Sequence, residues 1–555
     1  MESQRNLLFI GLLVVSYLLW NQWQADKAPK PQQVATATQQ QQQDNFVPEA
    51  SNNTTATADV PAEKGTLTRR QMITITTDEL QLLVDPMGGD IIEAQLLNHT
   101  VSQDSKQPIT LLEQSANRTY VAQSGLIGRD GPDSRPQGRP LYEAEKNDYT
   151  LAAGANELVV PLTWVSPEGL TVTKEFILKR GHYDLQVQFK VNNTLSTPVE
   201  VQFYGQLKQS IATPEDQKSH MFMASAYRGG AYSTSEVRYQ KETFDKMKET
   251  NLNITTKGGW VGMLQHYFVS AWAGEAEGQN HIYSRVVNNS KDAIIGIKEP
   301  LTTVAPGATV TLGSALWIGP KLQDQMASVA KHLDLTVDYG WLWFIAQPLF
   351  KLLQFLHSLV GNWGVAIILI TLIVRGGMYP LTKAQYTSMA KMRMLQPKLT
   401  ALRERFGEDR QKMSQAMMEL YKQEKVNPLG GCFPILIQMP IFIALYWTLM
   451  ESVELRHAPF ALWLTDLSVK DPFYVLPLLM GATMWWIQKM SPTTVTDPMQ
   501  QKVMQFMPIL FTFMFLWFPA GLTLYWLVSN IVTIAQQTYI YRHLEKKGLH
   551  SREKK

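Results

Sequence analysis

The chain has 555 residues and a formal net charge of +3, which excludes a generally basic nucleic-acid-binding protein. A hydrophobic fraction of 45% and a mean hydropathy of −0.14 are typical of a soluble protein. However, the apolar and aromatic residues concentrate in about the last 220 positions. We therefore expect one part of the chain in water and the other in a membrane. The single cysteine, Cys432, excludes an intrachain disulfide and a paired-cysteine zinc site.

Residues 1–23 consist of a short leader that carries Arg5 and an apolar segment, Leu7–Trp23. A cleaved signal peptide needs small residues just before its cleavage site, but cleavage after Ala25 would put Trp23 at the −3 position. We therefore predict an uncleaved signal-anchor helix with the amino terminus in the cytoplasm. Residues 24–62 are Gln-rich with few large apolar side chains, which predicts a disordered linker.

Residues 63–335 contain no run of 18 apolar residues, but apolar and polar residues alternate with a period of two. The alternating apolar positions are Leu80, Leu82 and Val84, and later Leu185, Val187, Phe189 and Val191. Turn signals such as Met87-Gly88-Gly89-Asp90 separate the predicted strands. This region is therefore predicted to be a large, all-β antiparallel sandwich.

Residues 336–360 are predicted to form an amphipathic helix at the membrane interface. Its polar side chains recur at spacings of four, three and four residues, at Gln347, Lys351, Gln354 and Ser358. Trp341 and Trp343 would lie at the level of the lipid headgroups. The alternative is an ordinary core helix of the β domain.

Five apolar segments follow within residues 361–541 and predict a membrane-spanning core. They are Gly361–Leu381, Gly430–Met450, Phe473–Ile487, Met504–Phe518 and Gly521–Tyr541. The third and fourth segments have 15 residues each, so as helices they extend about 22 Å against a hydrocarbon core of roughly 30 Å. Either they are re-entrant or the bilayer thins around them. The predicted fold class is a multi-domain membrane protein, an α-helical bundle of five core spans plus the anchor and the β domain.

Charge predicts the orientation of these spans. Residues 382–428, between the first two segments, carry ten Lys or Arg residues against five Asp or Glu residues, and residues 542–555 form a basic tail. By the positive-inside rule, this loop and both termini are cytoplasmic. Apolar spacing predicts that the loop is a helical hairpin, which either packs on itself or presents a Met-rich surface to nascent apolar segments.

Arg375 lies inside the first apolar segment, where burying its charge in lipid costs about 2.5 to 3.5 kcal/mol. The side chain could snorkel toward Thr382, about two helical turns further on. Alternatively, it could line a hydrated cavity. The second segment carries Gln438, and the last carries Ser529 and Asn530. Several polar groups around one unpaired arginine favour the cavity.

Covalent catalysis has no support in the sequence, which lacks the zinc-protease helix motif, the G-x-S-x-G elbow and the phosphate-binding P-loop. We therefore expect a protein that is not an enzyme and uses no cofactor or metal.

Four motifs closely resemble the YidC family of membrane protein insertases. They are Tyr379-Pro380-Leu381-Thr382, Met392-Arg393-Met394-Leu395-Gln396-Pro397, Asn427-Pro428-Leu429-Gly430-Gly431-Cys432 and Gln438-Met439-Pro440-Ile441-Phe442. The resemblance covers essentially the whole chain and is to the Gram-negative form. It implies a multi-pass protein of the bacterial inner membrane, with a periplasmic β-supersandwich related to galactose-mutarotase-like folds.

The resemblance also implies a hydrophilic groove that is closed toward the periplasm and open to the cytosol and lipid. The residues expected in or beside this groove are Arg375, Thr371, Gln438, Met439, Pro440, Tyr525, Trp526, Ser529 and Asn530. Met439 and Pro440, together with the predicted span Met504–Phe518, would form an apolar path for a departing substrate helix.

The function that the resemblance implies is insertion and folding of newly made membrane proteins, alone or with the Sec translocon. The implied partners are nascent membrane proteins, the Sec translocon with its accessory complex, ribosomes with their targeting receptor, and membrane lipids. Two alternatives stay open. A small-solute transporter would also have a polar bundle core, and a membrane-tethered carbohydrate-active enzyme would place its function in the sandwich.

Overall fold

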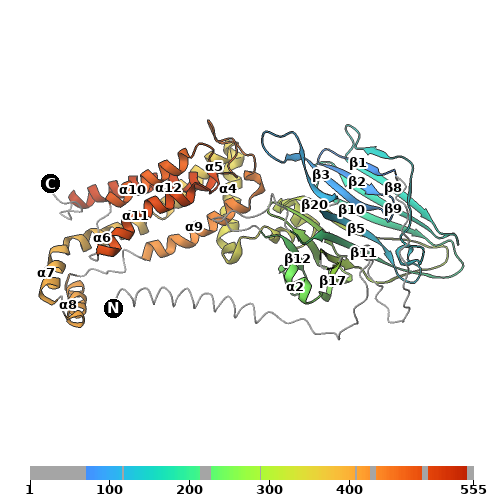
Figure 1. Cartoon of the computed structure of the whole chain (residues 1–555), viewed down its shortest axis with the longest axis horizontal. Helices are drawn as coiled ribbons and strands as arrows, with labels where there is room; N and C mark the ends of the chain where they lie inside the picture. The colour runs from blue at the N-terminus through green and yellow to red at the C-terminus, as the bar shows by residue number, and fades with distance from the viewer. Residues whose placement is uncertain are drawn as a thin grey trace.

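The computed structural model describes residues 71–115, 118–212, 227–287, 289, 291–406, 409–424, 433–490 and 498–546. The predicted anchor, the predicted linker and residues 547–555 of the predicted tail lie outside the described residues. Figure 1 shows a β-rich part and a helical part that follow one another along the longest axis of the molecule.

Twenty strands build the β-rich part. Their bounds are β1 Ile73–Thr76, β2 Leu80–Asp85, β3 Asp90–Thr100, β4 Pro108–Gln114, β5 Thr119–Ile127, β6 Glu143–Ala144, β7 Asp148–Thr150, β8 Glu157–Val165, β9 Thr171–Lys179, β10 Asp184–Asn192, β11 Val199–Ser210, β12 Gly229–Ser233, β13 Gln240–Glu242, β14 Asn253–Lys257, β15 Trp260–Leu264, β16 Phe268–Ala273, β17 Gln279–Val287, β18 Asp292–Lys298, β19 Thr302–Val304 and β20 Thr309–Pro320. The short helices α2 (Phe244–Glu249) and α3 (Gln323–Val329) accompany them.

The strands form two sheets. The eleven-stranded sheet has the order β14-β17-β18-β11-β5-β4-β3-β2-β1-β7, with β19 paired to β11. The nine-stranded sheet has the order β13-β12-β15-β16-β20-β10-β9-β8-β6. Among the described strands, β1 and β7 form the one parallel pair. The structure therefore confirms the large all-β domain.

The alternation seen in the sequence is the reason why these segments are half-buried strands. Every predicted apolar position in β2 and β10 is at most 1% exposed, whereas the side chains between them reach the surface. The turn from β2 to β3 uses Gly88 and Gly89 with φ of +76° and +64°, a left-handed conformation that glycine adopts without strain.

Aromatic side chains from both sheets meet in one core. Phe203 of β11 lies 5.8 Å from Phe189 of β10 and 5.9 Å from Trp272 of β16, measured between ring centroids. Gly205 lies directly beneath Trp272, because a Cβ atom added there would be 2.6 Å from the indole ring. This contact across the two sheets fixes their face-to-face packing.

The helical part begins after two short 3₁₀ turns, Leu333–Thr336 and Gly340–Leu342. Its helices are α4 Trp343–Val360, α5 Trp363–Gly377, α6 Tyr379–Met394, α7 Gln396–Phe406, α8 Arg410–Gln423, α9 Phe433–Glu451, α10 Val475–Met490, α11 Pro498–Phe515 and α12 Ala520–Lys546. In α4, Ala346, Phe350, Leu353 and Leu356 are buried, whereas Trp343 is 52% exposed. One face of α4 is thus packed and the other is open.

The first predicted span, Gly361–Leu381, contains a bend. The structure divides it into α5 and α6, whose axes are bent by 60°. Gly376 and Gly377 favour a helix least among residues other than proline, and Pro380 cannot donate a backbone hydrogen bond. These residues end α5 at Gly377.

Among the described residues, no single helix combines the length and apolar character needed to cross a bilayer, and only the bent pair of α5 with α6 meets these criteria when taken together. The short third and fourth segments are α10 and α11, with 16 and 18 residues. These correspond to about 24 and 27 Å of helix.

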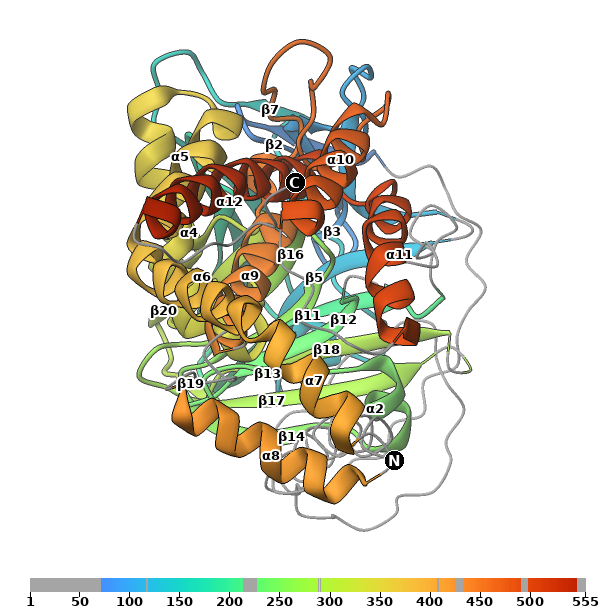
Figure 2. The ribbon, with the colours of Figure 1, turned by 90° about the vertical axis from the view of Figure 1, so that its left-hand side faces the viewer.

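The predicted hairpin in residues 382–428 consists of α6, α7 and α8. An ion pair between Lys398 of α7 and Glu424 at the end of α8 joins its two arms. Figures 1 and 2 show α7 and α8 apart from α10 and α12, at the end of the helical part farthest from the β-sandwich.

The β-sandwich also packs directly on the helical part, which the sequence did not predict. Arg456, in the connection between α9 and α10, donates hydrogen bonds to the carbonyl oxygens of Thr100 (2.6 Å) and Val101 (3.1 Å). His266 lies 3.0 Å from the carbonyl oxygen of Met450. The β domain is therefore docked on the connection between α9 and α10.

Candidate functional site

The Arg375 side chain points to α12. Its Nε donates a hydrogen bond to Ser529 Oγ at 2.8 Å, and its Nη2 donates to the same oxygen. Arg375 is half-buried, and no carboxylate in the described part of the chain forms an ion pair with it. The guanidinium is thus held by a neutral partner, and its Nη1 donates to no described residue. This geometry argues against the snorkelling alternative, in which the side chain would extend along α5 and α6.

Thr371 lies one helical turn before Arg375 and is fully buried. Its Oγ1 donates a hydrogen bond of 2.6 Å to the carbonyl oxygen of Ile367 in the same helix. Residues four apart share one face of a helix, so Thr371 is near Arg375 as expected. Its hydroxyl proton, however, is donated within α5 and is not available to another group.

Asn530 follows Ser529 in the chain but faces a different helix. Its Nδ2 donates to Thr483 Oγ1 at 3.0 Å and to the carbonyl oxygen of Met480 at 3.4 Å, both in α10. The structure therefore does not bring Asn530 together with Arg375. Its contacts join α12 to α10, which is the usual role of a polar side chain in a helical bundle.

Tyr525 and Trp526 lie on α12 one turn before Ser529. Tyr525 is buried and stacks on Phe442 of α9, with ring centroids 6.1 Å apart. Trp526 contacts Phe442 edge-on at 4.4 Å and Phe515 of α11 at 5.0 Å. These two residues thus form an aromatic junction between three helices beside the arginine.

Gln438, Met439 and Pro440 lie on α9, and Pro440 is inside the helix. Met439 is 49% exposed, whereas Gln438 and Pro440 are half-buried. The side chains of Gln438 and Met439 make no hydrogen bond to a described residue. The structure thus places them on a helix that reaches α12 through Phe442, and no hydrogen bond joins their side chains to Arg375.

A further contact to Arg375 comes from Gln536, whose Nε2 donates a hydrogen bond of 3.1 Å to the Arg375 carbonyl oxygen. The sequence shows a polar residue in an apolar helix at this position, but it does not show which way the side chain points. Gln536 lies seven residues after Ser529, which corresponds to about two helical turns and therefore to the same face of the helix. This spacing is the signal in the sequence that could have placed Gln536 beside Arg375.

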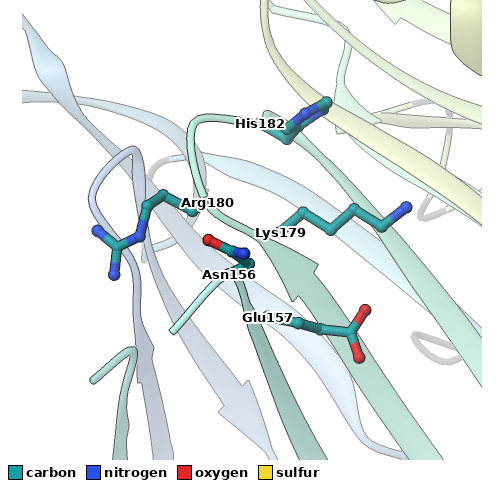
Figure 3. A pocket seen from close by; sticks show the side chains of 5 residues that line it. All are labelled: Asn156, Glu157, Lys179, Arg180 and His182. Atoms are coloured by element: carbon teal, nitrogen blue, oxygen red, sulfur yellow. The ribbon is translucent and has the colours of Figure 1, made fainter. Parts of the chain in front are cut away.

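The described residues offer no metal site, because no three His, Cys, Asp or Glu side chains gather in a suitable cluster. A hollow of about 330 Å³ on the β domain is lined by Asn156, Glu157, Lys179, Arg180 and His182. Figure 3 shows that Arg180 extends away from Lys179 and Glu157. The hollow contains one carboxylate, whereas glycoside hydrolysis requires two that face each other.

These features define a class of protein in which a β-sandwich is docked on a helical core that carries a half-buried arginine with a neutral side-chain partner. Residues 72–352 match the family model of the YidC periplasmic domain, and residues 355–547 match that of the 60Kd inner membrane protein. The chain belongs to the YidC family of membrane protein insertases, which are not enzymes, and it is an inner-membrane protein with a periplasmic domain.

The chain is similar over its whole length to relatives named membrane protein insertase YidC. It is 66% identical to the one from Aeromonas hydrophila over 555 residues and 65% identical to the one from Tolumonas auensis over 561 residues, with 100% of each chain covered. A solved structure of an active YidC insertase is 17% identical with a TM-score of 0.36, covering 84% of this chain and 92% of that one.

Proposed function

We propose that this chain inserts newly made proteins into the inner membrane, and assists their folding there, through a hydrophilic groove around Arg375. The observation that carries this proposal is the arginine itself, which has one neutral side-chain partner, Ser529, among the described residues. An ionised side chain among apolar helices costs free energy and is retained where it is used. Its unused N–H donors can receive an acidic group of a passing chain.

The physical mechanism needs no nucleotide. Transfer of an apolar substrate segment from water to lipid provides the driving force. The barrier is the desolvation of the polar tail that must cross, and a partly hydrated site with a fixed positive charge lowers it. The aromatic junction of Phe442, Tyr525 and Trp526, together with the exposed Met439, would give the apolar segment a path along α9 and α11 into lipid.

We also propose six membrane spans with both termini and the α6–α8 hairpin in the cytoplasm. The charge bias of residues 382–428 and the position of the hairpin at the end opposite the β-sandwich support this topology. A cysteine near Arg410 or Ser551 should be shielded from an impermeant thiol reagent added outside spheroplasts, whereas one near Gly229, at the exposed Ser235, should react. Reaction at Arg410 would refute the topology.

The partners belong to the same proposal. From the family resemblance, we propose that nascent membrane proteins, the Sec translocon with its accessory complex, ribosomes with their targeting receptor, and membrane lipids bind this chain. Co-purification from gently solubilised membranes tests the protein partners one by one. Absence of the translocon from such preparations would restrict the chain to independent insertion.

Reconstitution tests the proposed function most simply. Purified chain in liposomes should insert a small substrate that needs no translocon, without added nucleotide, and liposomes that lack the chain should not. Insertion is measured as the fraction of substrate protected from external protease. Solute flux without insertion would favour the transporter, and sugar turnover by the full chain would favour the carbohydrate-active enzyme.

A further inference from the structure

The break between α5 and α6 disturbs the backbone hydrogen bonds beside Arg375. α5 ends at Gly377, and the axis turns by 60° before α6 continues from Tyr379. The last carbonyl groups of a helix lack the usual partner four residues ahead. For the Arg375 carbonyl that residue is Tyr379, which lies beyond the bend, where α6 begins. Within the apolar part of a membrane protein, each such carbonyl needs another donor.

Gln536 supplies that donor from α12. Its side-chain Nε2 donates to the Arg375 carbonyl oxygen at 3.1 Å. Only the NH₂ end of the amide can donate to a carbonyl, so this contact also fixes the orientation of the amide. The Oε1 atom of Gln536 is then directed into the protein, where it is buried and accepts no hydrogen bond from a described residue.

Two residues of one helix therefore hold Arg375 at both ends. Ser529 accepts from the guanidinium, and Gln536 donates to the main-chain carbonyl. The two lie seven residues apart, or about two helical turns, and so on the same face of α12. A long flexible side chain that is anchored at its tip and at its backbone keeps few of its conformations.

We propose that Gln536 is a positioning residue for Arg375, which fixes the end of α5 on α12 and thereby directs the guanidinium into the groove. This inference rests on the proposed function of Arg375. Gln536 acts through Arg375, and its own role is to hold the backbone from which the arginine side chain starts.

A double-mutant cycle tests this role. Gln536→Met keeps the length and volume of the side chain but removes the donor. The four proteins are the wild type, Gln536→Met, Arg375→Ala and the double variant, each reconstituted at equal amounts in liposomes. Each inserts two matched substrates, one with an acidic translocated tail and one with a neutral tail. The readout is the initial rate of protease protection for each substrate.

We expect Arg375→Ala to slow the acidic tail about fivefold and the neutral tail little, since a change of about 1 kcal/mol in a barrier is roughly a factor of five. Gln536→Met should slow the acidic tail about two- to threefold and the neutral tail little. The double variant should be no slower than Arg375→Ala alone. If Gln536 acts only by positioning Arg375, its loss has no further effect once the arginine side chain is gone.

A matched control is Gln354→Met in α4, where the glutamine is also half-buried and its side chain makes no hydrogen bond to a described residue. It should leave both rates unchanged. Multiplicative slowing in the double variant, or equal slowing of both tails by Gln536→Met, would overturn the positioning role while the effect of Arg375→Ala stands. If Arg375→Ala itself fails to distinguish the tails, the proposed function of the arginine fails first.

Discussion

At the scale of single residues, His266 shows how one side chain joins the β domain to the helical part. Its Nε2 must donate to the Met450 carbonyl, 3.0 Å away, because a carbonyl only accepts. The imidazole stacks on Tyr267 with 3.9 Å between ring centroids. Burial lowers the pKa of His266 to about 4, and the positive charge of Lys321 acts in the same direction. The docked state therefore favours the neutral imidazole.

We predict that acid weakens this docking. Because the pKa is lowered from 6.5 to about 4, the stabilisation is complete above pH 6.5 and is lost as the pH falls from 6.5 toward 4. Each pH unit in this window removes about 1.4 kcal/mol, so about 3 kcal/mol is lost by pH 4. Burial, followed by the charge of Arg456, also lowers the pKa of His99 to about 4. Protonation of His99 in acid should therefore weaken the docking as well.

Nitroxide labels at Asp104 and Leu462, both exposed residues on the two sides of the contact, can report docking through dipolar broadening. The labels require a background in which Cys432 is replaced by Ser. Broadening should be strong near pH 7.5 and weaker near pH 5. His266→Gln keeps a donor that does not titrate, so its pH dependence should be smaller. Equal broadening of the unsubstituted protein at both pH values would contradict the prediction.

At the scale of elements, the break between α5 and α6 is the feature that sets the direction of Arg375. A Cβ atom added at Gly376 or Gly377 would meet nothing within 4 Å. Alanine therefore fits at both positions, and each substitution favours a continuous helix by about 1 kcal/mol. Lack of space therefore does not require glycine at either position, whereas the bend favours it.

We predict that Gly376→Ala combined with Gly377→Ala makes the protein more heat-stable and slows insertion severalfold, because a straighter segment carries Arg375 away from Ser529. Thermal unfolding in detergent and protease-protected insertion measure the two effects. Ser358→Ala, at an exposed position of α4, is the control for helix propensity alone. A faster or unchanged insertion rate would show that the bend is dispensable.

Features that depend on the local sequence can be predicted from it, whereas side-chain orientations between helices cannot. The alternation in β2 and β10 predicts buried strands because strand burial depends on local order. Arg375 is recognisable because a charge in an apolar segment is conspicuous. The orientation of Asn530 toward α10 and of Gln536 toward the Arg375 carbonyl depends on how helices rotate against each other. No local pattern encodes that rotation.

At the scale of the whole molecule, the β-sandwich and the helical part share buried side chains in addition to the chain that joins them. Phe350 of α4 and Ala444 of α9 belong to the same buried cluster as the core of the β-sandwich. The sandwich thus contacts the connection between α9 and α10 at the end of the helical part opposite the hairpin. We infer that the periplasmic domain holds the outer ends of these helices while the hairpin end stays free to receive substrate.

We propose that Arg375 attracts acidic groups in the substrate tail that crosses the membrane. At 4 Å and an effective dielectric constant near 20, its attraction for a carboxylate is about 4 kcal/mol before desolvation. Desolvation of both groups leaves a net effect of about 1 kcal/mol, or roughly fivefold in rate. We therefore expect Arg375 to change the rate of insertion, and we expect insertion to continue without it.

The most direct test is a protease-protection time course in cells depleted of the native protein and supplied with Arg375→Ala or Arg375→Lys. Substrates with matched acidic and neutral translocated tails are compared. We predict that Arg375→Lys is nearly normal, and that Arg375→Ala slows the acidic tail severalfold more than the neutral one. Equal slowing of both tails, or no slowing of either, would contradict the claim that the charge of Arg375 acts on the substrate.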